Sequence, residues 1–181
     1  MEAPVKNDSQ TLDPGFVEEW SRRYLEVWNA HDGDAVAAFC TEYVVWSDPG
    51  LPEPITGRGG VRAFVAATAR AFPDFHVDEL EPPFLSPAEP RVLSPYRMTG
   101  TMLGDWEAAG LAATGARIDV IGVDDWTFRD GLLSRYSTYY DSLGMARQLG
   151  ILPSVGSVGD RVMARVQHAQ ARLQRRQQSR A

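Results

Sequence analysis

The sequence predicts an α+β domain in which a curved antiparallel or mixed sheet wraps around a long N-terminal helix, with a further helical extension at the C-terminal end. Helical periodicity dominates the first 72 residues, and strand-like segments with short connections follow. A chain of 181 residues that is 44% apolar can also bury a core without disulfides or metal. A sheet that wraps around a helix forms a cone, and such a cone is often open at one end as a pocket.

The first helix should follow a leader, residues 1–12, that we predict to be disordered. Asp13 offers an N-cap and Pro14 suits the first helical position, so the helix is expected to begin there and to end near Asn29. A short second helix is expected over residues 35–39, after the turn HDGD. Apolar side chains recur at helical spacing in the first helix, at Phe16, Val17, Trp20, Tyr24, Val27 and Trp28.

A short strand and a third helix come next. The run YVVW, residues 43–46, is β-branched and aromatic and is bounded by an Asp-Pro-Gly turn, which predicts a strand. The third helix is expected after the Gly59-Gly60 pair, because side chains at three- and four-residue spacing then fall on one face. These side chains are Val61, Phe64, Val65, Thr68 and Phe72.

Beyond Pro73 the pattern becomes that of strands. Residues 75–81 alternate between polar and apolar side chains, and residues 91–101 are strand-like. Residues 116–128 predict a long strand, and residues 132–141 predict another, joined to it by a tight turn at residues 129–131. Short connections between successive strands favour an antiparallel sheet.

The C-terminal part differs in composition from the rest of the chain. We predict a domain over residues 13–152, followed by a linker and a basic helix over residues 153–181. The helix could be solvated or frayed, or it could be an arm that docks on a partner or on a second copy. Its arginines are Arg165, Arg172, Arg175, Arg176 and Arg180.

Composition excludes several functional classes. The formal net charge is -6 and the domain has no basic patch, so no nucleic-acid partner is expected. The single cysteine, Cys40, lies in an apolar stretch, which predicts a buried and inert thiol without a disulfide. The sequence has no run of 18 apolar residues, so we expect a cytoplasmic protein without a membrane partner. His31, His76 and His168 lack metal-ligand spacing, and we assign no metal and no cofactor.

Asp48 is the first candidate for chemistry. It stands in WSDPGLPEPITG, where an aspartate before Pro-Gly could simply begin a turn by hydrogen bonding its own backbone. It could equally be a base at the mouth of a pocket. The residue pattern alone leaves both interpretations open.

Asp124 and Asp125 are neighbours on the long strand, so their side chains must point to opposite faces of the sheet. Asp124 shares its face with Trp126 and Phe128. A carboxylate on such a face is costly if it is ionised and unpaired, so it should be protonated or should serve a site. Periodicity by itself does not decide which of the two faces lies inside.

Three polar side chains share one face of the last strand, at Tyr136, Thr138 and Tyr140. They could line a moderately polar pocket for a ring-bearing ligand, or they could lie on a hydrated outer face. Tyr24 lies on the apolar stripe of the first helix and is expected to face the core. Its hydroxyl needs a partner there, whether the residue is structural or catalytic.

These residues resemble a known superfamily. RRYLEVWNAHDGDAVAAFCTEYVVWSDP, followed by GRGGVRAF, looks like the opening of the nuclear transport factor 2-like superfamily of cone-shaped α+β domains. GLAATGARIDV, FRDG and YYDSLGMARQLG look like the closing part of its SnoaL-like polyketide cyclase branch. The resemblance covers about residues 15–152 and implies the fold, whereas the superfamily includes isomerases, cyclases, epoxide hydrolases, dehydratases and binders.

The opening part is also similar to ketosteroid isomerases. That resemblance places Tyr24 on the oxyanion-hole tyrosine, Asp48 on the general base, and Asp124 on the carboxylic acid that these isomerases keep protonated. It turns Asp124, Trp126, Tyr136, Thr138 and Tyr140 inward and turns Asp125 away. Trp46, Trp126, Tyr136, Thr138 and Tyr140 would then bind a flat ligand.

The resemblance implies a cofactor-free enzyme that acts next to a carbonyl of a hydrophobic, polycyclic small molecule, by isomerisation or aldol-type cyclisation. The alternative is a non-catalytic binder of hydrophobic ligands or a dimerisation module. The cyclase mechanism does not carry over intact, because Thr138 stands where those enzymes have a catalytic aspartate. An epoxide-hydrolase-like activity is a further alternative, although Arg97 has Thr99 and not an aspartate two residues on. A homodimer through the open sheet face is also implied.

Overall fold

The structure is a computed structural model that describes residues 12–178. The predicted leader, residues 1–12, lies outside the described residues except for Leu12. The last three residues, 179–181, lie outside them as well.

The starts of α1 and α2 follow from side-chain capping. In α1 (Pro14–Asn29), Asp13 Oδ1 accepts a 2.9 Å hydrogen bond from Phe16 N–H and so satisfies a donor of the first turn. The bounds of α1 agree with the prediction. Asp32 caps α2 (Gly33–Ala38) through Ala35 N–H in the same way, and this cap starts α2 two residues earlier than expected. α3 (Gly57–Ala71) also begins earlier, at Gly57, whose φ of 72° suits glycine.

One mixed sheet carries the strands in the order β2-β1-β7-β6-β5-β3, with β4 beside β5. The β1–β7 pairing is parallel and the other pairings are antiparallel. The two-residue strands are too short to show alternation and are not predicted from the sequence. The strands are β1 (Cys40–Ser47), β2 (Ile55–Thr56), β3 (His76–Glu79), β4 (Phe84–Leu85), β5 (Arg91–Thr101), β6 (Arg117–Arg129) and β7 (Leu132–Tyr140).

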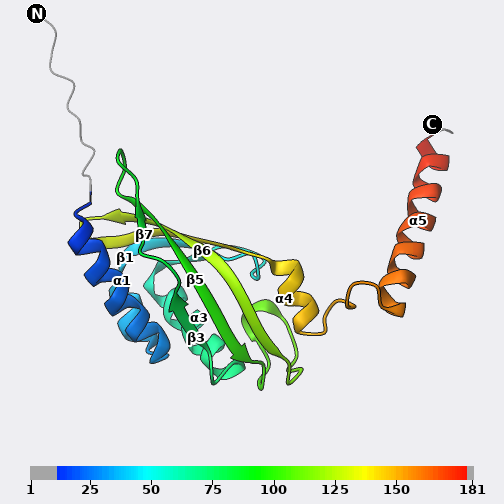
Figure 1. The fold of residues 1–181 in the computed structure, drawn as a ribbon, viewed down its shortest axis with the longest axis horizontal. Helices are drawn as coiled ribbons and strands as arrows, with labels where there is room; N and C mark the ends of the chain where they lie inside the picture. The colour runs from blue at the N-terminus through cyan, green and yellow to red at the C-terminus, as the bar shows by residue number, and fades with distance from the viewer. Residues whose placement is uncertain (1–11, 179–181) are drawn as a thin grey trace, which may run out of the picture.

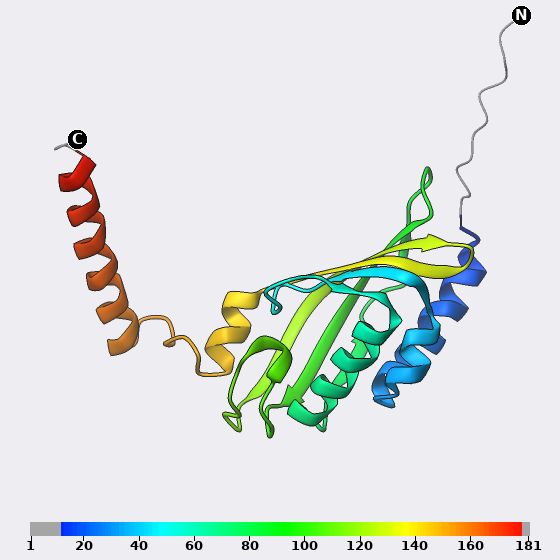
Figure 2. The same cartoon turned by 180° about the vertical axis from the view of Figure 1, so that it is seen from behind.

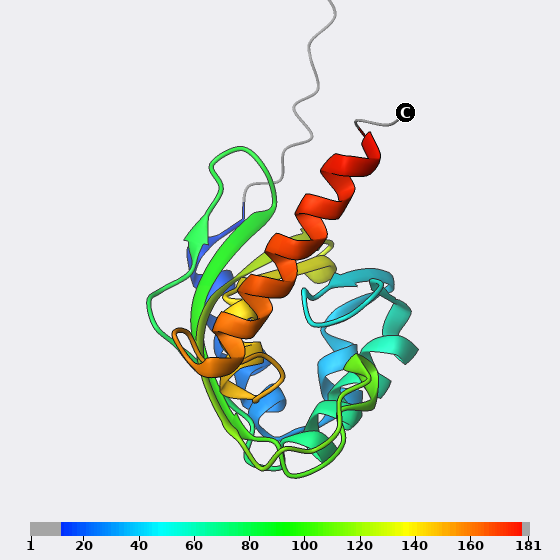
Figure 3. The same cartoon turned by 90° about the vertical axis from the view of Figure 1, so that its right-hand side faces the viewer.

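The sheet curves around the helices. α1 and α3 lie against its concave side, while β5, β6 and β7 run along the full length of the domain (Figure 1, Figure 2). Viewed from the end that carries α4 (Ser142–Gln148), the strands follow an open arc (Figure 3). Trp20 of α1 joins the layers, because its ring centroid lies 5.1 Å from that of Trp126 and 4.8 Å from that of Phe128. The predicted α+β fold is therefore confirmed.

Two further elements complete the chain. A short 3₁₀ helix, η1 (Glu107–Ala109), lies in the connection between β5 and β6. α5 (Val158–Gln178) projects from the domain after a short linker, and the side chains of Val162, Val166 and Leu173 are exposed (Figure 1). None of the described helices is both long enough and apolar enough to cross a membrane.

Candidate active site

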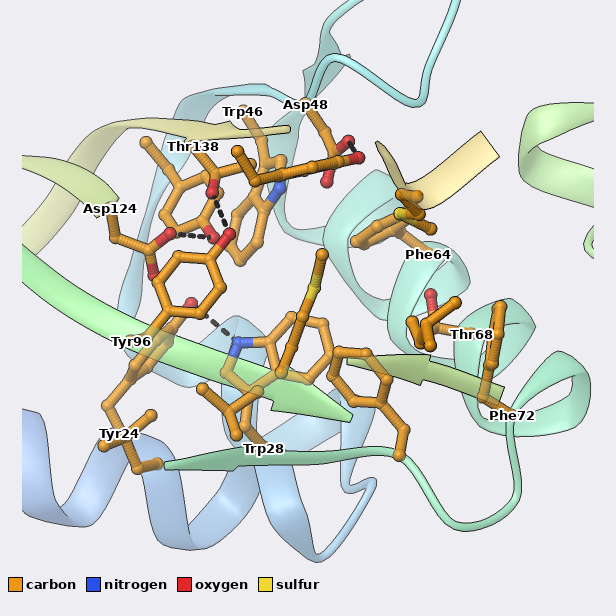
Figure 4. Close-up of a pocket in the computed structure, with 18 of the residues that line it drawn as sticks. Tyr24, Trp28, Trp46, Asp48, Phe64, Thr68, Phe72, Tyr96, Asp124 and Thr138 are labelled. Atoms are coloured by element: carbon orange, nitrogen blue, oxygen red, sulfur yellow. Dashed lines mark hydrogen bonds between the residues drawn. The ribbon is translucent and has the colours of Figure 1, made fainter. Parts of the chain in front are cut away.

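A cavity lies between α1, α3 and the inner face of the sheet (Figure 4). Its volume is about 60 Å³, which is small beside the roughly 300–1,000 Å³ of sites for drug-sized ligands. Two carboxylates and several hydroxyls interrupt a mainly apolar wall. The apolar part of the wall includes Trp28, Trp46, Phe64, Phe72, Phe75, Val77, Met98, Trp106, Ile118 and Met145. A few polar groups in an apolar cavity are typical of a site that binds a small molecule.

Asp48 follows β1 directly and lines this cavity. Its Oδ1 accepts hydrogen bonds from Gly50 N–H at 2.7 Å and from Tyr140 O–H at 2.8 Å, and the described residues supply no hydrogen bond to Oδ2. Burial raises the pKa of Asp48 above its ordinary value, while the hydrogen bonds from Gly50 and Tyr140 act in the opposite direction. Asp48 is thus a turn residue and a cavity residue at once.

Asp124 lies on the inner face of β6 and is only 6% exposed. Its Oδ1 accepts a 2.7 Å hydrogen bond from Tyr136 O–H. Burial raises the pKa of Asp124 to about 7, although the Tyr136 hydrogen bond lowers it, and the charge of Asp48 raises it further. Burial thus favours the protonated form of Asp124 far more than it would for an exposed aspartate.

Asp125 points to the opposite face of the sheet, as the alternation predicts. Its two oxygens accept hydrogen bonds from Arg91, at 2.7 and 2.5 Å. Arg97 also belongs to the outer side of the sheet, where it pairs with Asp119 and both side chains are about half exposed. No arginine is among the described residues that line the cavity, so an Asp-Arg-Asp water-activating group is not formed there.

Tyr24 of α1 faces the cavity and is 1% exposed. Its hydroxyl accepts a 2.8 Å hydrogen bond from the Trp28 indole N–H one turn further along the helix. Burial raises the pKa of Tyr24 well above its ordinary value, so the phenol keeps its proton. Within residues 12–178 this proton has no hydrogen-bond acceptor, and Tyr24 makes no hydrogen bond to Asp124.

Tyr96 of β5 is a cavity residue that is not predicted from the sequence. Its hydroxyl lies 2.6 Å from Thr138 Oγ1, and so it reaches across β6 to β7. Gly122 makes this possible, because a Cβ at that position would lie 2.5 Å from Tyr96 Oη. A lone glycine within a strand pattern often marks such a close approach, and this is the one sequence signal that could have located Tyr96.

The predicted ligand-binding residues reach the cavity with one exception. Trp46 stacks on Tyr136 with ring centroids 3.7 Å apart and an interplanar angle of 23°. Both of these residues, Thr138 and Tyr140 line the cavity. The exception is Trp126.

Trp126, a predicted ligand-binding residue, does not reach the cavity. Its side chain is 0% exposed and does not line the cavity. Instead it packs against Trp20 and Tyr24, with ring centroids 5.1 and 5.8 Å apart. Trp126 and Asp124 do share the inner face of β6, but α1 covers the strand at Trp126, so facing inward there means lying in the core.

Several cavity residues were predicted only as parts of helix stripes. Trp28 belongs to the stripe of the first helix, and Phe64, Thr68 and Phe72 belong to that of the third. Trp106, by contrast, lies in an irregular connection for which no periodic pattern exists. Among the described residues, no group of three or more His, Cys, Asp or Glu side chains could hold a metal ion.

Comparison with known proteins agrees with this architecture. A family model described as a SnoaL-like domain matches residues 21–136, more than half of the chain. The chain belongs to this SnoaL-like family. No curated protein matches it significantly.

Solved structures with the same SnoaL-like fold cover most of the chain. TsrD from Streptomyces laurentii superimposes with a TM-score of 0.66 at 23% identity, covering 78% of this chain and 99% of TsrD. A candidate polyketide cyclase from Xanthomonas campestris pv. campestris superimposes with a TM-score of 0.65 at 23% identity. The match covers 75% of this chain and 98% of the cyclase. A protein with a ketosteroid isomerase-like fold from Catenulispora acidiphila superimposes with a TM-score of 0.62 at 15% identity. The match covers 73% of this chain and 92% of that protein. At these identities the likeness shows the fold.

Proposed function

We propose that this SnoaL-like protein is a cofactor-free acid/base enzyme that acts next to a carbonyl group of a hydrophobic small molecule. The observation that carries the proposal is a pair of buried carboxylates in different environments at one apolar cavity. Asp48 has one oxygen held and one free, whereas Asp124 has a pKa raised to about 7 by burial. Acid/base sites typically contain titratable groups whose different environments shift their pKa values, so that one acts as an acid and another as a base.

Asp48 is the general base in this proposal. Gly50 and Tyr140 hold Oδ1 and so orient the carboxylate, which leaves Oδ2 to take a proton from the carbon next to the carbonyl. Its raised pKa makes the ionised form a stronger base than an exposed aspartate. The product of this step is an enolate, whose negative oxygen needs hydrogen-bond donors.

Asp124 and Tyr24 are the proposed donors. Protonated Asp124 can donate from one oxygen while the other still accepts from Tyr136. Tyr24 accepts from Trp28 and keeps its own proton for the ligand, and accepting one hydrogen bond polarises a hydroxyl for donating another. Buried donors aimed at developing charge contribute roughly 3–4 kcal/mol each to catalysis.

The ligand is compact in this proposal. A cavity of about 60 Å³ is smaller than the roughly 150 Å³ that holds a benzene ring, so even a ligand of one or two rings would have to displace side chains or remain partly outside. The stacked pair of Trp46 and Tyr136 supplies a flat wall for such a ring. Return of the proton from Asp48 to a different carbon gives isomerisation. Attack of the enolate carbon on a second carbonyl, whose oxygen then takes that proton, gives cyclisation.

A non-catalytic binding role is the second candidate, and one observation favours it. The hydrogen bond from Gly50 N–H to Asp48 is the local turn contact expected of an aspartate before Pro-Gly. In that case Asp48 shapes the loop at the cavity, and its charge has no role in chemistry.

Hydrogen exchange in heavy water separates the two candidates. Wild-type protein and Asp48→Asn are incubated with small cyclic ketones, and loss of the proton next to the carbonyl is followed by NMR. If the protein is an enzyme, we expect it to catalyse exchange, and we expect the exchange rate to fall at least about 100-fold in Asp48→Asn. Asp130→Asn is the matched control, because Asp130 is an exposed turn residue with a φ of 52° that asparagine also tolerates. Ligand binding without exchange by wild-type protein would favour the binder.

A further inference from the structure

The cavity wall contains buried polar atoms without partners. Within residues 12–178, five buried side-chain nitrogen or oxygen atoms make no hydrogen bond. Three of them, Trp46 Nε1, Thr68 Oγ1 and Trp106 Nε1, belong to residues that line the cavity. Their side chains are at least nine-tenths buried, with exposures of 1%, 4% and 5%. Unpaired buried donors thus concentrate around this one cavity.

Two of these donors lie on the side of the cavity formed by α3 and the η1 connection. Thr68 lies on α3 and Phe72 is the C-cap of that helix, and the Phe72 ring packs edge-on against Trp106 with centroids 5.6 Å apart. Figure 4 shows Thr68 and Phe72 across the cavity from Asp124 and Thr138, with aromatic side chains between them. The proposed chemistry uses the Asp124 end and leaves the Thr68 end without a role.

A missing partner is unusual for either group. A threonine within a helix commonly hydrogen bonds the carbonyl one turn earlier, and a buried tryptophan N–H commonly finds an acceptor. Leaving a buried donor unpaired costs free energy, which a ligand acceptor at the same place would recover. Trp28, which reaches the same cavity from α1, provides a contrast, because its N–H is paired with Tyr24.

We propose that the cavity binds a ligand with two oxygen functions at opposite ends of a flat apolar body. One oxygen is the carbonyl at the Asp124 and Tyr24 end, and this assignment rests on the proposed function. The other is a hydrogen-bond acceptor that receives the Thr68 hydroxyl and the Trp106 N–H. The substrate class is then a compact oxygenated ring ketone, and not a hydrocarbon-like ketone with a single polar end.

A matched pair of ligands tests this inference. 6-Methoxy-1-tetralone carries a carbonyl and, across its fused rings, an ether oxygen that can only accept a hydrogen bond. In 6-ethyl-1-tetralone a methylene replaces that oxygen in nearly the same shape. Binding of both is measured by calorimetry with Asp48→Asn, in which the proposed chemistry is blocked. We expect the methoxy ketone to bind about tenfold more tightly, although the ethyl ketone is more hydrophobic.

Variants then assign the preference to the two donors. Thr68→Val keeps the shape of the side chain and removes the hydroxyl, and Trp106→Phe removes the indole N–H. Made in the Asp48→Asn background, each should reduce the preference severalfold, and the two together should abolish it. Thr68→Ser keeps a hydroxyl and should retain the preference. An unchanged preference in the double variant, or none in the starting protein, would overturn the inference.

Failure of this inference and failure of the proposed function give different results. A methoxy preference that depends on Thr68, together with no exchange of the ketone protons by wild-type protein, would sustain the ligand class and reject the enzyme. Catalysed exchange of the protons of both ketones, with equal binding of the two, would support the enzyme and reject the proposed ligand class. If neither ketone binds, the two-ended ligand is rejected.

Discussion

The phenol of Tyr136 donates a 2.7 Å hydrogen bond to Asp124 Oδ1, and both side chains are buried. The bond joins neighbouring strands, since Asp124 lies opposite Thr138 and the Tyr136 side chain reaches it diagonally. Trp46 stacks on the same phenol ring from β1. The ionisation of Asp124 is therefore set by burial, which favours the neutral acid, and by a fixed donor, which favours the carboxylate.

Tyr136→Phe should raise the pKa of Asp124 above about 7, because the hydrogen bond that stabilises the carboxylate is lost while the ring remains. The measurement is an NMR titration of the Asp124 carboxyl carbon in labelled protein. Tyr43→Phe removes a hydroxyl from a side chain that is 81% exposed and should leave the titration unchanged. An Asp124 pKa that stays the same or falls in Tyr136→Phe would contradict this assignment.

Asp124 should also make stability depend on pH. Its pKa is raised from 3.8 to about 7 in the folded protein, so its contribution to stability is fully present below about pH 4 and is lost as the pH rises through 7. Asp124→Asn cannot ionise, so the stability of this variant relative to wild type should increase between pH 4 and 7 and then level off.

Urea unfolding of the two proteins at several pH values measures this difference. Each unit of pKa shift corresponds to about 1.4 kcal/mol, so a change of a few kcal/mol is the upper bound. Asp130→Asn, in the exposed turn, serves as the control with no such trend. A difference between wild type and Asp124→Asn that is constant over this range would reject a raised pKa for Asp124.

Tyr140→Phe should raise the pKa of Asp48, because the Tyr140 hydrogen bond holds it down. If Asp48 is the base, the acid limb of the exchange rate against pH should move to higher pH, and the rate at low pH should fall. Tyr139→Phe is the matched control on the outer face, where its side chain is 61% exposed. Identical pH profiles for the two variants would show that Tyr140 does not position Asp48.

Gly122→Ala should destabilise the fold by about 1–3 kcal/mol, because its Cβ would lie 2.5 Å from Tyr96 Oη and 2.9 Å from Tyr139 O. The displaced Tyr96 should also lose its hydrogen bond to Thr138. Gly59→Ala in α3 has no atom within 4 Å of its new Cβ and should stabilise by about 0.5–1 kcal/mol. Urea unfolding of both variants tests these opposite signs, and a neutral Gly122→Ala would contradict the close approach.

Local patterns predicted much of the fold because they depend on neighbouring residues. Asp13 and Pro14 locate the start of α1, and alternation locates β5, β6 and β7. The bounds of α2 and α3 differ from prediction. The capping aspartate Asp32 starts α2 before its apolar stripe, and α3 begins at Gly57 without a side-chain cap. Strands of two residues carry too little pattern to be predicted.

The site was predictable only in part. Asp48, Tyr24 and Asp124 were assigned through resemblance, and the structure brings all three to one cavity. Trp126 lies outside the cavity wall, because alternation gives the face of a strand but not what covers that face. Trp106 had no periodic pattern, and the sequence signal for Tyr96 was a glycine on the neighbouring strand, opposite it in register.

The sequence by itself determined the order of the main helices and strands, the cap of the first helix at Asp13, and the opposite orientation of Asp124 and Asp125, since these follow from backbone geometry over a few residues. Only the tertiary structure decided that Asp48 is both a turn residue and a cavity residue, held by Tyr140 from 92 positions away. It also decided that Asp124 is buried beside Tyr136 while Trp126 is sealed in the core. Strand register and the curvature of the sheet around α1 set these distances, and both arise from packing between segments that are distant in the chain.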